Sequence, residues 1–328
     1  MELTFWGVRG SISSGETPQE EERNIRDVLK KFTETQKDNP GREADSLIDE
    51  FVETNRNEIL SQGCHTISVD IKTPKTQMII DCGSGMLRLA NEIIKDPKAL
   101  GQGEFHIFLT HFHWDHLMGL PFFTPIYIKN NVINLYAVQE DLERVIKLIF
   151  TPPMFPVPYK MLASNIRFHK LEPRKPFQLN ELAVTPYELD HPDTCWGFKV
   201  TNGTRTLSHC VDTMANRVSD RDLGPDLPLY QDTDLMVFDA QYSFVELLEK
   251  SDWGHSSASI GIDIAIKRNI PKVVFIHHDP LARPHKIRTI EKQARSYYKN
   301  QRKSFEKRGL KPPEIEIIFG REGLKLTI

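Results

Sequence analysis

The chain has 328 residues, of which 39% are hydrophobic and 27% charged, values typical of a globular protein with a substantial core. Its net charge of −3 gives no overall bias toward nucleic acid or a membrane surface. Four scattered cysteines without a CxxC pair, the absence of a long apolar run and the absence of a secretory signal lead us to expect a cytoplasmic protein with no membrane partner.

A first strand is predicted at residues 3–8, and the segment after it, residues 16–60, differs in character from the rest of the chain. This segment holds 13 acidic and 7 basic residues. Its apolar side chains recur at helical spacing in two groups separated by Asn39-Pro40-Gly41. The groups are Ile25, Val28, Leu29 and Phe32, then Leu47, Ile48, Phe51 and Val52. We therefore expect an inserted helical hairpin at about 16–60, which is a candidate for mediating a homodimer or for acting as a lid.

From residue 66 onward, short β-rich runs alternate with helical stretches. Strands are predicted at 66–71, 77–81, 105–110, 134–137, 183–188, 197–201, 206–211, 235–239, 272–277 and 314–319. Helices are predicted at 86–95, 139–149, 256–269 and 284–307. This mixture predicts a layered α/β fold, and because no linker interrupts it we expect one domain over residues 1–328.

A run of metal-binding residue types, THFHWDHLMG, follows the predicted strand 105–110. His111, His113, Asp115 and His116 offer imidazole and carboxylate ligands, which suit Zn, Fe or Mn. A tight turn after the strand would divide these side chains between two neighbouring ions. The alternative, a chance histidine-rich loop, is hard to reconcile with this spacing at a strand end.

Further histidine and aspartate residues follow other predicted strands: His191, Asp212, and the pair His277 and His278. Each alone suits a structural role. Together with the first run they supply five histidines and two aspartates, a set that suits two adjacent divalent ions and one activated water.

His255 lies in the sequence GHSS, just before the predicted helix 256–269. Such a position favours an anion, so His255 is a candidate for binding phosphate or donating a proton, and the alternative is a capping role beside Ser256. Asp81 ends a strand and would either orient a ligand histidine or satisfy turn amides. Arg9 would either reach a substrate anion or be an ordinary surface arginine.

The segment 286–308 is rich in lysine and arginine and contains Tyr297 and Tyr298. These features suggest nucleic acid, but a solvated charged helix face explains them more simply, and we expect no nucleic-acid partner.

The motifs resemble those of the metallo-β-lactamase superfamily, over residues 1–15 and 61–328. HFHWDH matches its HxHxDH motif, and His191, Asp212 and the final histidine match its later ligand positions in order. The resemblance implies a four-layer αββα sandwich with a dinuclear centre. One ion would be held by His111, His113 and His191, and the other by Asp115, His116 and the last histidine, with Asp212 bridging them.

Within that superfamily the sequence is more similar to the branch of ribonuclease Z and the cyclic-phosphate esterases. IDCGSGMLRL and the order GHSS, helix, VVFIHHD carry this likeness. It implies that His255 contacts phosphate, that His277 is the last ligand with the adjacent His278 as the alternate, and that Asp239 in LMVFDAQY is structural. QGCHTIS departs from the usual Gly-Gly-Asn-Thr segment, and no Gly- and Pro-rich arm is present, which weakens a tRNA-processing role.

The resulting expectation is a hydrolase with two divalent ions, Zn first and Mn or Fe otherwise, acting on a cyclic nucleotide or another small phosphodiester. A hydroxide between the ions would attack phosphorus, Asp115 would position it, and His255 would protonate the leaving oxygen. Two alternatives remain: hydrolysis of a carbonyl substrate (lactone, β-lactam or thioester) at the same centre, and a non-catalytic metal-binding regulatory module that uses the acidic hairpin for partners.

Overall fold

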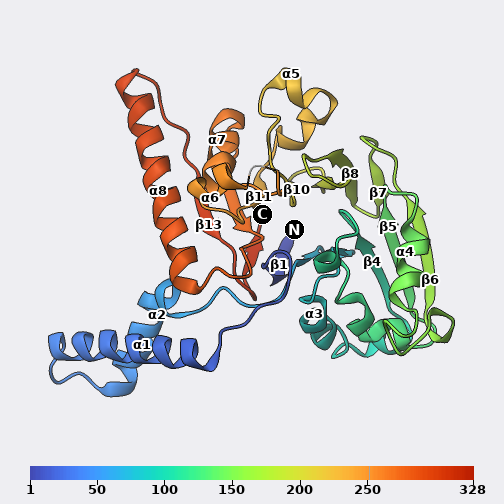
Figure 1. Cartoon of the computed structure of the whole chain (residues 1–328), viewed down its shortest axis with the longest axis horizontal. Helices are drawn as coiled ribbons and strands as arrows, with labels where there is room; N and C mark the ends of the chain where they lie inside the picture. The colour runs from blue at the N-terminus through green and yellow to red at the C-terminus, as the bar shows by residue number, and fades with distance from the viewer. Residues whose placement is uncertain (251) are drawn as a thin grey trace.

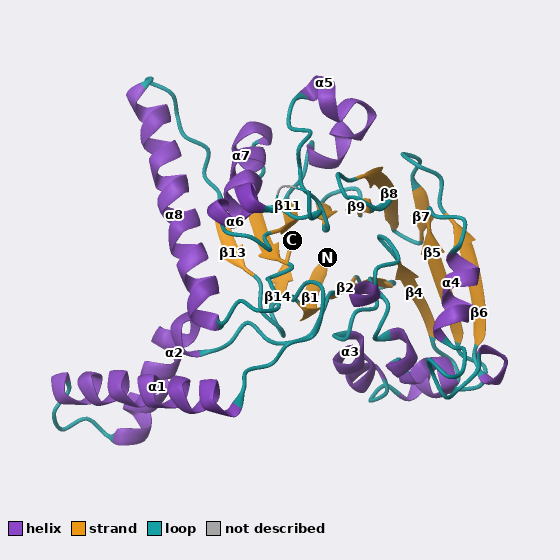
Figure 2. Cartoon of the chain, viewed as in Figure 1, coloured by secondary structure: helices purple, strands orange, loops and turns teal. Residues whose placement is uncertain are grey.

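Two seven-stranded mixed sheets lie face to face in the computed structural model, which describes residues 1–250 and 252–328 (Figure 2). The first sheet has the order β14-β1-β2-β3-β4-β5-β6 and the second the order β13-β12-β11-β10-β9-β8-β7. The strands of the first sheet are β1 (Glu2–Gly7), β2 (Ser68–Lys72), β3 (Gln77–Ile80), β4 (Glu104–Phe108), β5 (Val132–Ala137), β6 (Asn165–Lys170) and β14 (Lys325–Thr327). Those of the second are β7 (Phe177–Leu179), β8 (Leu182–Glu188), β9 (Trp196–Thr201), β10 (Thr206–Cys210), β11 (Leu235–Asp239), β12 (Lys272–Ile276) and β13 (Glu316–Phe319).

Helices cover the outer face of each sheet, so the layers run helix, sheet, sheet, helix (Figure 1). The first sheet packs against α3 (Met86–Ile93) and α4 (Leu142–Ile149), and the second against α7 (Ala258–Arg268) and α8 (Pro284–Lys307). Two short helices, α5 (Asp220–Leu223) and α6 (Phe244–Glu249), lie in connections. The predicted αββα sandwich is confirmed. Among the described residues, no helix has both the length and the apolar character needed to cross a membrane.

Central strands of this sandwich are buried on both faces, which explains their nearly continuous apolar sequences. In β12, Val274 and Ile276 point into the core between the sheets, whereas Val273 and Phe275 point into the core under α7 and α8. Successive side chains of a strand face opposite sides, so one run of VVFI serves two cores. Both faces of these strands are therefore packed, and the packing fixes the positions at which the loops leave the sheets.

The predicted hairpin is also confirmed: α1 (Pro18–Asp38) and α2 (Ala44–Ile59) follow β1 and project from the body (Figure 1). Thr17 and Glu20 form a capping box at the start of α1, with Pro18 in its first turn. Phe32 and Phe51 join the two helices edge to face, with ring centroids 5.3 Å apart. No residue of α1 is buried.

The strands β6, β7 and β14 and the helices α5 and α6 were absent from the sequence prediction. β7 and β14 have three residues each, and β6 has alternating polar residues and no fully buried side chain, so their apolar signal is weak. Several predicted strands were one or two residues too long at an end, among them those observed as β4 and β12. Thr110 lies beyond β4, and His277 lies beyond β12 with φ of +62°, in the left-handed region.

Candidate metal centre

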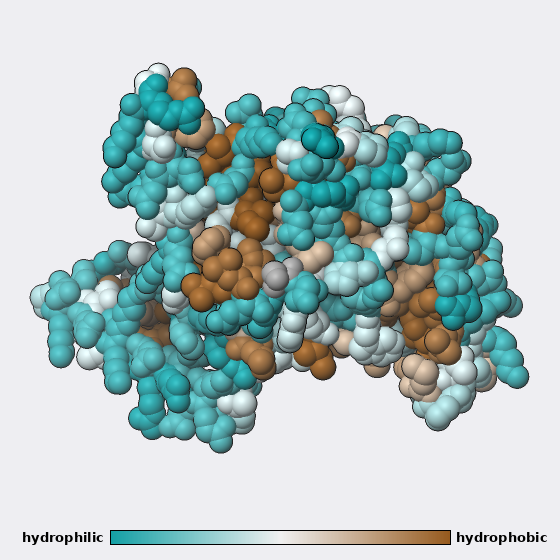
Figure 3. All heavy atoms as spheres, turned by 45° about the horizontal axis from the view of Figure 1, so that its top comes forward, coloured by the Kyte–Doolittle hydropathy of each residue, from teal (hydrophilic) through white to brown (hydrophobic). Residues whose placement is uncertain are grey.

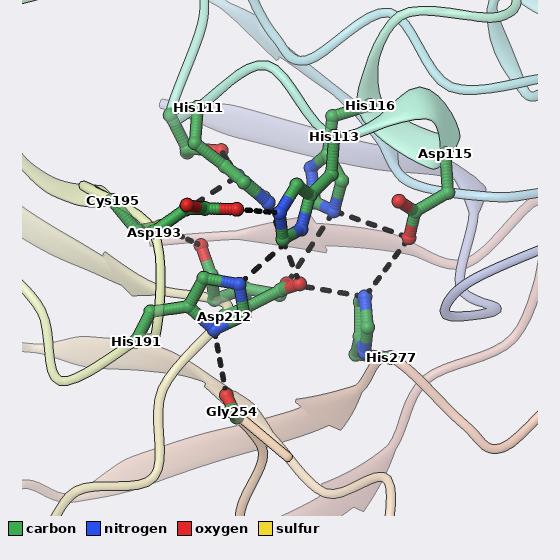
Figure 4. A network of polar contacts seen from close by, with 12 residues as sticks. His111, His113, Asp115, His116, His191, Asp193, Cys195, Asp212, Gly254 and His277 are labelled. Atoms are coloured by element: carbon green, nitrogen blue, oxygen red, sulfur yellow. Dashed lines mark hydrogen bonds and ion pairs between the residues drawn. The ribbon is translucent and has the colours of Figure 1, made fainter. Parts of the chain in front are cut away.

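The seven predicted ligand side chains gather where loops follow β4, β8, β10 and β12, at one edge of the two sheets (Figure 4). Their ligand atoms form two groups, each with all atoms within 4.8 Å of one another. The first group is His111, His113, His191 and Asp212, and the second is Asp115, His116, Asp212 and His277. Asp212 belongs to both groups and therefore lies between them.

The loop after β4 is held from beneath by the turn after β3. His116 and Gly119 exchange backbone hydrogen bonds with Cys82, at 2.8 Å in both directions. A side chain at Gly119 would collide with the carbonyl of Gly83, so glycine is needed for this close approach. Asp115 is held in turn, because its Oδ2 accepts a hydrogen bond from the Ser11 backbone N–H at 2.7 Å.

His116 and His191 each have one ring nitrogen held by the protein, which leaves the other for an ion. Asp81 Oδ2 lies 2.8 Å from His116 Nδ1, and the same carboxylate accepts hydrogen bonds from Thr110. The Gly254 carbonyl oxygen lies 2.9 Å from Nδ1 of His191. The placement of Asp81 supports an orienting role for it rather than a role in satisfying turn amides alone.

His113 is held by a residue that the sequence analysis did not single out. Asp193 Oδ2 lies 2.7 Å from His113 Nε2, so His113 turns its Nδ1 toward His191 Nε2, 3.3 Å away. A carboxylate two residues beyond a candidate ligand, in HPD, is the sequence signal that would have identified it. The supporting role of Gly254 was likewise not predicted from the sequence. Its φ is +89°, and an added Cβ would lie 2.5 Å from the His191 ring.

The donor set fits divalent cations. His111 Nε2, His116 Nε2 and Asp212 Oδ1 are buried and have no hydrogen-bond partner within residues 1–250 and 252–328, although such atoms usually find one. Burial lowers the pKa of His111 and of His191, so both rings are neutral, as ligands must be.

The second ligand group has an excess of negative charge, and the pKa of His116 reflects it. Burial lowers its pKa, but the carboxylates of Asp115, Asp212 and Asp81 outweigh burial and raise that pKa well above the usual value. The proton on His116 thus offsets part of the negative charge of these carboxylates. A divalent ion bound here would offset that charge more strongly. A cluster of acidic and imidazole ligands of this kind is consistent with metal binding.

His255 lies beside both groups. Its Nδ1 is 2.9 Å from Asp239 Oδ2 and 3.9 Å from Asp212 Oδ2, and its ring stacks on His277 with centroids 4.7 Å apart. Burial lowers the pKa of His255, but the charge of Asp239 and its hydrogen bond raise it to about 9. Nothing in these contacts resembles helix capping, because α7 begins two residues after Ser256 with Ser257 as its N-cap.

The adjacent histidines His277 and His278 point to different places. His277 Nε2 lies 3.1 Å from Asp212 Oδ1 and 3.3 Å from Asp115 Oδ2. His278 Nε2 instead donates to the Gly320 carbonyl oxygen at 3.0 Å. Of the two, only His277 lies among the candidate ligands, which favours it as the last ligand.

Arg9 is buried rather than placed on the surface. Its guanidinium donates to the carbonyl oxygens of Gly63, Asp279 and Ala282 at 2.8, 3.0 and 2.6 Å. It thereby ties together the loops before β2 and after β12. These contacts support a role in holding the loop of His277, not direct contact with a substrate anion.

An αββα sandwich with buried histidine and aspartate clusters at one sheet edge defines a class, the metal-dependent hydrolases of metallo-β-lactamase fold. The family described as "Beta-lactamase superfamily domain" matches residues 76–278 of this chain. The chain belongs to this superfamily, as its motifs predicted.

Individual relatives are distant. Ribonuclease Z of Prochlorococcus marinus (strain NATL1A) is 20% identical over 264 residues, covering 63% of this chain and 79% of that protein. Among solved structures, the metallo-β-lactamase fold protein YhfI of Bacillus subtilis is 13% identical with a TM-score of 0.60, covering 99% of this chain and 98% of its own. Human tRNase Z, short form, is 16% identical with a TM-score of 0.59, covering 100% of this chain and 99% of its own. At these identities the structures show a shared fold.

Proposed function

We propose that this protein is a dinuclear metal-dependent phosphodiesterase acting on a cyclic nucleotide or another small phosphodiester. The observation that carries the proposal is His255, which lies within 4 Å of the shared Asp212 and is held by Asp239. A cationic imidazole beside two ligand groups suits an anionic substrate, because it adds positive charge where phosphate oxygens would lie. A carbonyl substrate does not need such a group.

The two ligand groups would each hold one divalent ion, with Asp212 contributing an oxygen to each. Zinc suits these imidazole and carboxylate ligands best, and manganese or iron also accepts them. When bound, the ions would supply an activated water and would offset negative charge on the substrate.

Residues of the chain would carry out the remaining work. Asp115, fixed by the Ser11 N–H, would orient the attacking water. His255 would bind a phosphate oxygen and donate a proton to the leaving oxygen, since Asp239 favours its protonated form. Its Nε2 has no hydrogen-bond partner among the described residues, which leaves that atom free for substrate.

The relatives support phosphorus chemistry in general terms, because ribonuclease Z and tRNase Z are named as ribonucleases and ribonucleases cleave phosphodiester bonds. They do not identify the substrate of this chain. Tyr297 and Tyr298 of α8 pack against the core of the second sheet, and most of its lysines face solvent, so α8 gives no independent reason to propose RNA.

The test is hydrolysis of bis-p-nitrophenyl phosphate, and of a panel of cyclic nucleotides, by protein loaded with Zn or Mn. We expect turnover by the wild type and a loss of about 10²-fold or more in His255→Ala, the size of a general acid's contribution. A wild type that is inert on every phosphodiester but cleaves a lactone, β-lactam or thioester would overturn the proposal. A protein that binds metal and cleaves neither class would indicate a regulatory module.

A further inference from the structure

The hairpin of α1 and α2 leaves apolar side chains of both helices uncovered. Ile25, Leu29, Ile48 and Val52 remain 39% to 59% exposed. Short helices gain most of their stability from burying an apolar face, and a two-helix projection buries little by itself. Both helices of the hairpin therefore carry apolar side chains that a partner could cover.

On α2 the uncovered apolar side chains share one face with acidic ones. On α2, Asp45, Ile48, Asp49 and Val52 are all exposed and follow the spacing i, i+3, i+4, i+7, which places them on one side of the helix. Neither aspartate forms an ion pair within the described part of the chain, and the whole segment 16–60 has a net charge of −6. A partner that covers this face needs positive charge beside apolar contact area.

α8 offers a surface of the opposite kind. It carries eight basic and two acidic residues, a net charge of +6. Lys292, Lys299, Lys303 and Lys307 are exposed along one side at spacings of seven, four and four, and none has an ion pair among the residues that the structure describes. Lysine stems also cover apolar surface well. In Figure 3 the side of the molecule that carries α8 and the hairpin is mainly hydrophilic.

Within one chain, acidic side chains of the hairpin already interact with basic side chains of α8 where the two elements touch. Glu20 at the start of α1 pairs with Arg283 at the start of α8. The pKa of Glu58 at the end of α2 is lowered, first by its bond to Lys31 and also by the charges of Lys292 and Arg288. These contacts tie the root of the hairpin to the first half of α8.

The same contacts keep the distal parts of the two elements apart. From the shared root, the hairpin extends to one side while α8 runs away from it along the body (Figure 1). The acidic face near Asp45 and Asp49 therefore cannot reach Lys299 and Lys303 of its own chain. A second copy of the chain presents the missing surface.

We propose that two copies form a reciprocal dimer in which the acidic face of α2 of one copy packs on the lysine side of α8 of the other. The arrangement is two-fold, so each copy gives and receives the same contact and the assembly closes at two. Asp45 to Val52 on α2 span ~10 Å, and Lys299 to Lys307 on α8 span ~12 Å, so these charged stretches are matched in length to within one helical turn. Opposite charge also speeds and orients association.

The test is a charge swap read by light scattering and sedimentation of the full-length protein. We expect a wild-type dimer that weakens as salt rises, because exposed charges are screened. Asp45→Lys/Asp49→Lys and Lys299→Glu/Lys303→Glu should each raise the dimer dissociation constant by tenfold or more. Mixing the two variants should restore a heterodimer with one restored contact, and combining all four substitutions in one chain should restore the homodimer.

A matched control is Lys129→Glu/Lys160→Glu, two exposed lysines on the first-sheet side of the molecule, which should leave the dimer intact. Circular dichroism establishes that each variant is folded. A monomeric wild type at tens of micromolar, or a dimer that survives both reversals, would overturn the proposal. The proposal would also be overturned if the wild type were a monomer that binds an RNA oligonucleotide and Lys299→Glu/Lys303→Glu abolished that binding. In that case α8 would bind nucleic acid.

Discussion

His255 Nδ1 and Asp239 Oδ2 lie 2.9 Å apart, which joins a loop before α7 to the last residue of β11. Asp239 also accepts the backbone N–H groups of Thr213 and Gln241, at 3.2 and 3.0 Å. One carboxylate thus fixes the ring of His255 and the loop that begins with Asp212. Asp239, which the resemblance marked as structural, is therefore also a positioning residue for His255.

Replacing Asp239 with asparagine should shift the pH dependence of activity. Asp239 raises the pKa of His255, and a proton donor works only below its pKa, so activity falls as pH rises through that value. Asp239→Asn removes the charge, so the alkaline limb of the kcat/KM profile should move to lower pH and the maximum should fall by about 10-fold or more. An unmoved alkaline limb in a folded, metal-loaded variant would rule out this coupling.

Gly254→Ala should weaken binding at the first ligand group. The added methyl would lie 2.5 Å from the ring of His191 and push that candidate ligand aside. We expect zinc content measured by mass spectrometry to fall toward one ion per chain. Gly203→Ala is a matched control, because Gly203 has a similar φ of +85° with nothing within 4 Å of the added atom, so it carries backbone strain without the collision. Equal metal loss in both variants would contradict the prediction.

Asp81→Asn should lower metal affinity at the second group. Asp81 holds His116 by Nδ1, and loss of such a carboxylate typically costs about 10- to 100-fold in affinity. Competition with a chelator measures this directly. Asp193→Asn is a useful comparison, because Asp193 is 76% exposed and its bond to His113 is screened by water, so its effect should be smaller. The reverse order of effects would show that Asp81 does not orient His116.

Acid should destabilise the protein partly through His278. Burial, assisted by the charge of Arg9, lowers the pKa of His278 to about 3, whereas the unfolded chain titrates near 6.5. Between these values the unfolded state binds the extra proton, so this contribution to stability is complete above about pH 6.5 and is lost as pH falls toward 3.

His278→Gln should therefore flatten the pH dependence of stability. The free energy of unfolding, measured by denaturant titration with chelator at pH 6 and pH 4, should depend on pH less steeply in the variant, by about 1 kcal/mol per pH unit. Glutamine retains a donor for the Gly320 carbonyl, so the variant should stay folded. Identical slopes in the two proteins would show that His278 is protonated in the folded state.

The sequence by itself determined the long helices, the central strands, the hairpin and the run from His111 to His116. Each of these signals is local: apolar residues recur with period 3.6 or 2, or ligand types crowd into one turn. The predicted bounds of α8 agree with the structure at both ends because Pro284 and a clear apolar stripe mark it. Short edge strands such as β14 bury too little to leave such a pattern.

Only the tertiary structure decided how distant loops meet. His277 and His278 are adjacent and chemically identical, and the left-handed backbone at His277 sends one toward Asp212 and the other toward Gly320. Asp193 and Gly254 support the candidate ligands His113 and His191 across separations of 80 and 63 residues. Such contacts leave no periodic pattern in the sequence, because they form only when two rigid sheets bring the ends of their strands to a common edge.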